Sequence, residues 1–144
     1  MAKYCYEYPR PMVCVDCIII SQEGNEKSIL LIKRKNDPYK EMWALPGGFI
    51  DMDEDLEESA KRELKEETGI IVPKLTQFAT FGKPGRDPRG RTISVVYYFI
   101  SPSSLNAQAG DDAAEVKWFA LLDLPLIAFD HAMIISNFCE FNKD

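Results

Sequence analysis

Residues 48–70 constrain the fold more strongly than any other segment of this chain. They begin with a glycine turn and continue into a stretch with helical periodicity, in which Leu56, Ala60 and Leu64 recur at four-residue spacing. Residues with this spacing lie on one side of a helix, so we expect the apolar stripe to face a hydrophobic core. The segment therefore predicts a loop, an amphipathic helix over residues 56–68, and a second loop after it.

The same segment carries nearly all of the charge imbalance of the chain. Residues 51–67 contain nine acids and three bases, whereas the rest of the chain contains fourteen of each. On a helix, Glu63 and Glu67 are about 40° apart and Glu66 lies beside them, so three carboxylates share one edge. These carboxylates repel one another, and a hard divalent cation such as Mg²⁺ would compensate for the repulsion. A run of acids is also typical of a solvated helix face, so composition alone leaves both interpretations open.

Two glycines precede the predicted helix, in the sequence Pro46-Gly47-Gly48. Because glycine has no Cβ and tolerates positive φ, the backbone can approach a ligand closely at this point. A turn of this kind at the N-terminus of a helix would also direct N–H groups and the positive end of the helix dipole towards an anion. The glycines therefore favour a ligand site over a solvated acidic face.

The spacing of these residues resembles the Nudix box at every defined position, and residues 43–48 resemble its usual lead-in. The resemblance implies an α/β fold in which residues 1–144 form a single domain, an α/β/α sandwich with a mixed β-sheet and the box as loop–helix–loop. It also implies a hydrolase of nucleoside diphosphates linked to another group, which requires Mg²⁺ or Mn²⁺. The matching positions are Gly48, Glu54, Arg62-Glu63-Leu64, Glu66-Glu67 and Gly69-Ile70.

The resemblance also assigns roles to residues of the box. The metal ligands would be the side chains of Glu63, Glu66 and Glu67 and the backbone carbonyl of Gly48. Metal ions would polarise the diphosphate and lower the pKa of the attacking water, and a carboxylate would complete its deprotonation. The catalytic candidates in the box are Glu66 and Glu67, together with Glu54 and Arg62, which would orient the ligands.

The carboxylate that deprotonates the water comes either from the box or from an acid in a loop before the last strand, according to the same resemblance. Residues 110–115 read Gly-Asp-Asp-Ala-Ala-Glu and offer three acids in such a position. Glu115 and Asp112 are our candidates there. An acidic turn before a strand would have the same composition, so both interpretations stay open.

A second charged segment, residues 82–91, has the opposite sign, with four bases and one acid. Its two prolines and three glycines indicate a shaped loop, although a solvated turn with scattered charges would have a similar composition. Arginine can bind phosphate through two parallel hydrogen bonds, so an acidic metal helix and a basic loop together suit a diphosphate. The candidate substrate contacts are Arg34, Gly47, Arg86, Asp87, Arg89 and Arg91.

This basic loop, with Pro84 shortly after the box, resembles the ADP-ribose pyrophosphatase subgroup of the Nudix family, as do residues 126–131. The implied reaction converts ADP-ribose and water into AMP and ribose 5-phosphate, and such enzymes are often homodimers. His131 is the single histidine; at a helix start it is typically structural, and the resemblance places it at the pocket. Two alternatives are a Nudix hydrolase of another nucleotide, such as an oxidised nucleoside triphosphate or a sugar nucleotide, and a non-catalytic ADP-ribose sensor.

The rest of the chain predicts a mixed β-sheet with helices on both faces. Asp130 is the predicted N-cap of a final helix that ends near Phe141. Tyr4, Tyr6 and Tyr8 alternate before two prolines and predict a short edge strand or an arm. The predicted strands cover residues 12–20, 29–34, 43–45, 75–81, 92–100 and 115–120.

Cys14 and Cys17 form a Cys-x-x-Cys, a spacing also found in zinc and redox sites. They lie in a nearly continuous apolar run, which predicts a buried strand, so we expect small buried side chains on its opposite faces. There is no apolar signal region at the N-terminus and no run of about 18 apolar residues. We therefore expect a small nucleotide diphosphate as substrate, neither nucleic acid nor a membrane as partner, and a reducing cytoplasm as the simplest location.

Overall fold

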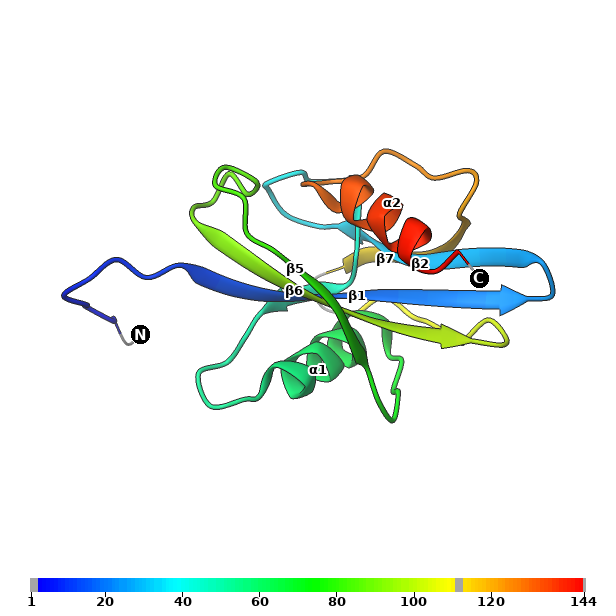
Figure 1. Ribbon diagram of the computed structural model, residues 1–144, viewed down its shortest axis with the longest axis horizontal. Helices are drawn as coiled ribbons and strands as arrows, with labels where there is room; N and C mark the ends of the chain where they lie inside the picture. The colour runs from blue at the N-terminus through cyan, green and yellow to red at the C-terminus, as the bar shows by residue number, and fades with distance from the viewer. Residues whose placement is uncertain (1–2, 111–112, 144) are drawn as a thin grey trace.

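The computed structural model describes residues 3–110 and 113–143. Its strands form one mixed sheet that lies between two helices (Figure 1). Helix α1 (Leu56–Thr68) covers one face, and helix α2 (His131–Phe141) covers the other. The predicted α/β/α sandwich, with the box as loop–helix–loop, is confirmed.

The sheet has the order β3-β2-β1-β6-β5, with β4 paired to β1 and β7 paired to β2. Strands β1 and β6 are parallel, and the other pairings between the described strands are antiparallel. Parallel strands require a long crossover, and the chain between β1 and β6 includes α1, which packs against the sheet. The strands are β1 (Met12–Glu23), β2 (Glu26–Arg34), β3 (Trp43–Ala44), β4 (Gly47–Phe49), β5 (Thr76–Phe81), β6 (Thr92–Ser101) and β7 (Ala113–Ala120).

Strand β1 contributes to two hydrophobic layers, one on each face of the sheet. Val15, Cys17 and Ile19 pack with Ala60 and Leu64 of α1. The isoleucines that alternate with them pack instead with α2. A strand covered on both faces reads as an almost continuous apolar run, which explains the composition of this segment.

The two glycines before the box helix form strand β4, so the prediction that they present N–H groups at the helix N-terminus is wrong. The N-cap of α1 is Asp55, whose carboxylate accepts the N–H of Leu56 at 2.7 Å. Gly47 pairs instead with Asp16 of β1, and a Cβ at this position would overlap Oδ1 of Asp16 and the carbonyl oxygen of Val15. The glycine is therefore required by the close approach of β4 to β1.

Two predictions near the termini have different outcomes: the side-chain cap of α2 is absent, and of the strand or arm predicted near Tyr4 the structure has the arm. Asp130 occupies the N-cap position of α2, but its carboxylate binds Arg86 instead of a helix N–H. Residues 3–11 form an arm without a strand, which extends away from the sheet (Figure 1), and the ring of Tyr4 stacks on that of Tyr6. Among the described residues, no helix combines the length and apolarity needed to cross a membrane.

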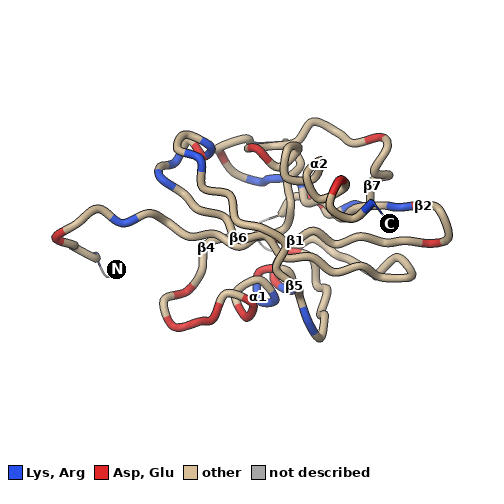
Figure 2. The backbone as a smooth tube through the Cα atoms, viewed as in Figure 1, with Lys and Arg blue, Asp and Glu red and all other residues tan. Residues whose placement is uncertain are grey.

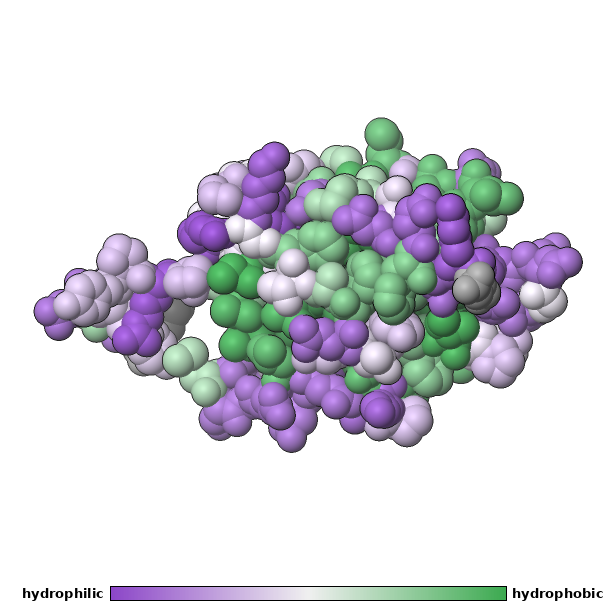
Figure 3. Space-filling model, viewed as in Figure 1, coloured by the Kyte–Doolittle hydropathy of each residue, from purple (hydrophilic) through white to green (hydrophobic). Residues whose placement is uncertain are grey.

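The surface in Figure 3 follows the same layers. Apolar surface crosses the middle of this face, where Figure 1 places β5 and β6, and polar surface borders it along α1. The polar border agrees with the acidic face that the sequence of this helix predicts, because only its apolar stripe contacts the sheet.

The loop before β7 is held on the C-terminal half of α1 by backbone contacts. The N–H of Gly110 donates to the carbonyl oxygen of Glu67 at 2.9 Å, and the N–H of Gln108 donates to that of Thr68 at 2.9 Å. A Cβ on Gly110 would overlap the carbonyl oxygen of Glu66. The loop can therefore pack at this depth only with glycine at position 110.

We expect Gly110→Ala to lower the free energy of unfolding by about 1–3 kcal/mol, the usual cost of overpacking a filled site. The added methyl group meets backbone, which cannot move without breaking the hydrogen bonds of this loop. Gly82→Ala is the matched control, because a Cβ there would lie 3.7 Å from Cγ1 of Ile93, an ordinary contact. Urea denaturation of the two variants measures the difference, and equal stabilities would contradict the close packing.

Candidate active site

A cavity of about 340 Å³ lies where β1, β4 and α1 meet the loops that precede β6 and α2. Figure 2 shows the bases of the β5–β6 loop on one side of the sheet and the acids of the box on the other, at the end of the molecule from which the N-terminal arm extends. The lining includes Glu63 and Glu67 from the acidic side, and Arg34 and Arg89 from the basic side. The two charged segments of the sequence therefore border one cavity.

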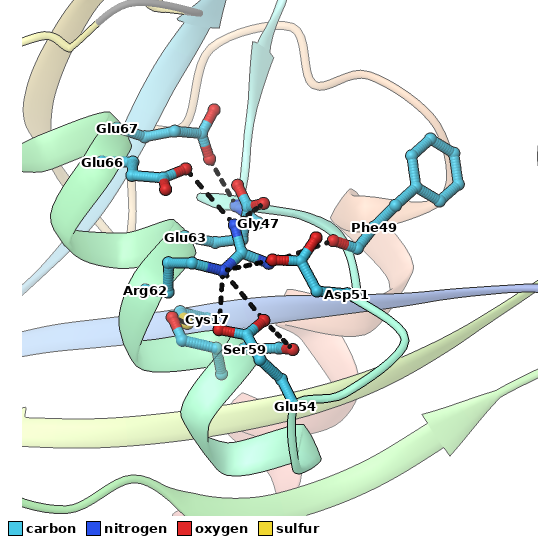
Figure 4. A network of polar contacts seen from close by, with 11 residues as sticks. Cys17, Gly47, Phe49, Asp51, Glu54, Ser59, Arg62, Glu63, Glu66 and Glu67 are labelled. Atoms are coloured by element: carbon cyan, nitrogen blue, oxygen red, sulfur yellow. Dashed lines mark hydrogen bonds and ion pairs between the residues drawn. The ribbon is translucent and has the colours of Figure 1, made fainter. Parts of the chain in front are cut away.

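Arg62 lies at the centre of the polar network of the box (Figure 4). Its Nε donates to both carboxylate oxygens of Glu54 at 2.9 Å, and Ser59 Oγ also donates to Glu54, at 2.8 Å. Its Nη1 donates to Glu63 at 2.8 Å and to Glu66 at 3.3 Å. One guanidinium thus orients two of the predicted metal ligands and ties the loop before α1 to the helix.

The pKa values of this network follow from its hydrogen bonds. Burial alone would lower the pKa of Arg62, but its hydrogen bonds with Glu54 and Glu63 raise the pKa above its ordinary value. The pKa of Glu54 is lowered first by the hydrogen bond from Ser59 and, against the opposing effect of burial, by Arg62. Arg62 and Glu54 are therefore both charged at neutral pH, which suits residues that orient other carboxylates.

The remaining predicted ligands meet the glycines of β4. Glu67 is buried, and its Oε1 accepts the backbone N–H of Gly47 at 2.7 Å. A Cβ on Gly48 would lie 2.6 Å from the carboxylate of Glu63, so the backbone of Gly48 and this carboxylate are in direct contact. The side chain of Glu66 is 56% exposed and turns towards Arg62.

This set of donors consists of oxygens alone, which suits a hard divalent cation such as Mg²⁺. In the described part of the chain, no three Asp, Glu, His or Cys side chains stand close enough together to hold an ion as they are. The exposed Glu66 is engaged with Arg62, so an ion would take the place of Arg62 as its partner. With that exchange, Glu63, Glu66, Glu67 and the carbonyl of Gly48 would be the residues to hold an ion, as the sequence predicts.

The opposite side of the cavity combines arginines with aromatic rings. The guanidinium carbons of Arg34 and Arg89 lie 5.0 and 5.1 Å from the ring centroid of Phe129, and that of Arg89 lies 4.8 Å from the centroid of Phe49. Asp87 accepts the backbone N–H, Nε and Nη2 of Arg89, and these bonds lower the pKa of Asp87 although burial opposes them. Arg89 is therefore held in one orientation, as a bidentate phosphate contact requires.

Asp16 and His131 lie at the floor of the cavity and are both buried. Nδ1 of His131 accepts the N–H of Leu45 at 3.0 Å, so the neutral imidazole carries its proton on Nε2. This nitrogen lies 3.8 Å from Oδ2 of Asp16. Burial lowers the pKa of His131, whereas burial raises that of Asp16 against the opposing effects of His131, Arg86 and a hydrogen bond from Ser94.

Arg86 and Arg91, two predicted substrate contacts, have surroundings that differ from those that the sequence suggested. The side chain of Arg86 borders the cavity but is 5% exposed. Its three nitrogens bind Asp130 and Ser94 at 2.8 Å, so it anchors the β5–β6 loop to the start of α2. Arg91 is exposed and does not line the cavity, and its carbonyl accepts the N–H of Met12.

Of the two candidate bases outside the box, only Glu115 belongs to the described residues, and it does not lie at the cavity. The side chain of Glu115 is 59% exposed, pairs with Lys33 at 3.4 Å and does not line the cavity. Asp112 lies outside the described residues. Gly110, the last described residue before Asp112, donates its N–H to the carbonyl oxygen of Glu67.

Several residues of the cavity were not predicted from the sequence. Cys14 and Cys17 are buried on opposite faces of β1, as predicted, but Cys14 borders the cavity. The sequence could have indicated Asp16 as a site residue, because burying a carboxylate within an apolar strand is costly unless the carboxylate has a partner or a role. Ser94 and Phe129 had no comparable signal, since neither residue type is unusual in its segment.

A model of the NUDIX domain matches residues 10–138. The chain belongs to the Nudix family. Over 136 residues it is 45% identical to an ADP-ribose pyrophosphatase of Methanocaldococcus jannaschii, and the match covers 94% of this chain and 78% of that protein. These matches confirm the predicted family and the predicted enzyme class, a Nudix pyrophosphohydrolase.

Two further Nudix proteins extend the comparison. Over 143 residues the chain is 42% identical to the ADPR responsive transcriptional repressor NtrR of Acinetobacter baylyi, covering 95% of this chain but 57% of the repressor. The NUDIX domain of Shewanella oneidensis NrtR, solved with ADP ribose, superposes with a TM-score of 0.85 at 34% identity, covering 93% of this chain and 90% of that chain. The chain thus resembles both an enzyme and a protein named as a transcriptional repressor.

We expect the free energy of unfolding to decrease as the pH falls below about 6.5, the ordinary pKa of histidine. Because the pKa of His131 is lowered in the folded protein, the unfolded chain binds a proton in this range that the folded chain does not. The decrease should reach up to about 1.4 kcal/mol per pH unit, and above the ordinary pKa the contribution is constant.

His131→Asn should reduce this slope, because asparagine retains an acceptor for the N–H of Leu45 and does not titrate. Urea denaturation of both proteins between about pH 5 and pH 8 measures the difference. Asp16 is present in both proteins, but His131 also lowers its pKa, so the comparison reports on His131 together with its effect on Asp16. Identical pH dependence of the wild type and the variant would contradict the lowered pKa.

Proposed function

We propose that this Nudix chain hydrolyses ADP-ribose to AMP and ribose 5-phosphate with Mg²⁺ or Mn²⁺. The observation that carries the proposal is the cavity bordered by Glu63, Glu67 and the backbone of Gly48 on one side and by Arg34 and Arg89 on the other. These two sides of the cavity suit a diphosphate. The carboxylates would bind it through a divalent ion, and the guanidinium groups would bind it directly. The similarity to proteins named for ADP-ribose supports this choice of substrate.

The residues of the chain would divide the chemistry between them. A bound divalent ion supplies polarisation of the phosphoryl oxygens and a lower pKa for the attacking water. Arg62 orients Glu63 and Glu66, and the N–H of Gly47 orients Glu67 towards the same cavity. Glu66 or Glu67 would accept the proton of the water, with Glu115 and Asp112 as the predicted alternatives.

The two arginines would act on the phosphates. Negative charge grows on the phosphoryl oxygens during the attack, and donors that are already oriented stabilise this charge without reorganisation. Asp87 orients Arg89 by three hydrogen-bonding groups, and Arg34 donates its Nε to the carbonyl of Pro38 at 2.7 Å. Asp87 would therefore act through Arg89 and not by contact with the substrate.

We expect the protein to release AMP from ADP-ribose with Mg²⁺ and to lose this activity when the metal is chelated. Glu67→Gln should lower kcat/KM by about 100-fold or more, because even residues that only orient metal ligands contribute about 10- to 100-fold. The variant keeps an acceptor for the N–H of Gly47, so the fold should be retained.

The control for this variant is Glu26→Gln, the same change at an exposed position of β2. Products are identified by chromatography from ADP-ribose, ADP-glucose, NADH and 8-oxo-dGTP. If another compound is turned over fastest, the result would support Nudix hydrolysis but contradict ADP-ribose as the substrate.

We expect Arg89→Lys to lower kcat/KM by about 10-fold or more, because lysine cannot make the bidentate, ring-stacked contact of a guanidinium. Arg91→Lys is the matched control, since Arg91 belongs to the same loop but does not line the cavity. Steady-state kinetics with ADP-ribose compares the two. An equal loss in both variants would contradict the assignment of Arg89 to the substrate.

A second candidate function is the binding of ADP-ribose without turnover, which the similarity to an ADPR responsive repressor favours. Calorimetry and product analysis on the same sample distinguish the two functions. Stoichiometric binding without AMP would support a sensor, whereas AMP release at catalytic turnover would support the hydrolase. A homodimer and the absence of a nucleic-acid partner stay predictions, which sedimentation and DNA-binding measurements test.

A further inference from the structure

We propose that Asp16 and His131 form a specificity-determining pair that recognises a neutral group of the substrate, one that both donates and accepts a hydrogen bond. This inference rests on the proposed function, because it concerns the same cavity. It goes beyond that function by assigning the floor of the cavity to a part of the substrate other than the phosphates.

The position of Asp16 relates this pair to the metal-binding side of the cavity. Asp16 of β1 pairs with Gly47 of β4, and Oδ1 of Asp16 is packed so closely on Gly47 that no Cβ fits there. The N–H of the same glycine donates to Glu67 at 2.7 Å. A single glycine therefore separates Asp16 from a predicted metal ligand, so the group recognised by Asp16 belongs close to the diphosphate.

The chemistry of the pair excludes a phosphate. Nε2 of His131 is a donor, because Nδ1 accepts the N–H of Leu45, and Oδ2 of Asp16 is an acceptor. Their separation of 3.8 Å is longer than a hydrogen bond, so the two atoms can serve a third group between or beside them. A phosphate oxygen only accepts and would be repelled by Asp16, whereas a hydroxyl, or an amino group beside a ring nitrogen, fits both partners.

The hydrogen bonds of Arg86 go to residues other than Asp16. The neighbouring Arg86 is already paired through two nitrogens with Asp130, and its third contact is the hydroxyl of Ser94. The anchor between the β5–β6 loop and α2 is therefore complete without Asp16. Asp16 accepts a hydrogen bond from Ser94, and because a carboxylate can accept several hydrogen bonds, a bound donor would add to this partner.

Two parts of ADP-ribose have the required chemistry, the ribose hydroxyls and the amino-bearing edge of adenine. A cavity of about 340 Å³ is at the small end of the range of ligand pockets, so it encloses a part of such a substrate. The experiment therefore has one arm for each source. Deoxy analogues of ADP-ribose lack one ribose hydroxyl, and the inosine analogue carries a carbonyl oxygen in place of the amino group.

The test is a cycle in which protein and substrate are changed separately and together. We measure kcat/KM with Mg²⁺ for wild type, Asp16→Asn and the exposed control Asp123→Asn. In wild type and control, loss of the recognised group should cost about 10- to 100-fold, the value of a hydrogen bond to a charged group. For Asp16→Asn, the analogue that lacks the recognised group should lower kcat/KM by less than about 2-fold. The analogue that lacks the other group should lower kcat/KM by the same factor in all three proteins.

Equal costs of every analogue in all three proteins would overturn the inference, since a structural residue does not respond to a single substrate group. If Asp16→Asn does not fold, His131→Asn takes its place in the cycle, because it retains an acceptor for Leu45 and lacks the Nε2 donor. Thermal melting shows which variant is folded before the kinetics are measured.

The same cycle measured by calorimetry without divalent metal separates this inference from the proposed function. Coupling in binding without any turnover would support the pair and contradict hydrolysis. Turnover of ADP-ribose without coupling would support hydrolysis and contradict the pair. Absence of both binding and turnover of ADP-ribose would overturn both.

Discussion

The close contact of strand β4 with its two neighbours is the constraint on which the site depends. Gly47 lies against Asp16 and Val15 of β1 on one side and donates its N–H to Glu67 of α1 on the other. Gly48 lies directly against the carboxylate of Glu63. Because no side chain fits at either glycine, β4 can lie between the sheet and the box helix, and the carboxylates of α1 reach the cavity at the end of the sheet.

Electrostatic balance is the second requirement, because α1 and the loop before it hold most of the acids in excess. Arg62 meets this requirement by binding Glu54 through both carboxylate oxygens and by donating to Glu63 and Glu66. The same contacts that offset the repulsion orient two of the predicted metal ligands. Folding and the proposed metal binding would therefore share one network, in which an ion would replace part of the charge of Arg62.

Several features of the fold and the site were predictable because they depend on local pattern. The bounds of α1 follow from the periodicity of its apolar residues, an N-capping Asp55 and Gly69, which has φ 76°. The convergence of acidic and basic segments followed from complementary charge, and both border the cavity. The errors concern partners distant in sequence: the carboxylate of Asp130 caps no helix N–H because Arg86, 44 residues away, binds it at 2.8 Å.

The sequence by itself determined the family, the box helix with its carboxylates, the two-sided burial of β1 and the sandwich of helices around a mixed sheet. These properties depend on residue type and spacing, which any single sequence displays. Only the tertiary structure decided that the glycines form a strand and that Arg86, although it borders the cavity, is an anchor bound to Asp130 and Ser94. It also decided that Asp16 lies near His131 at the cavity. The physical reason is that each hydrogen-bonding group binds the partner that lies nearest in space. The spacing of residues along the chain does not specify which partner that is.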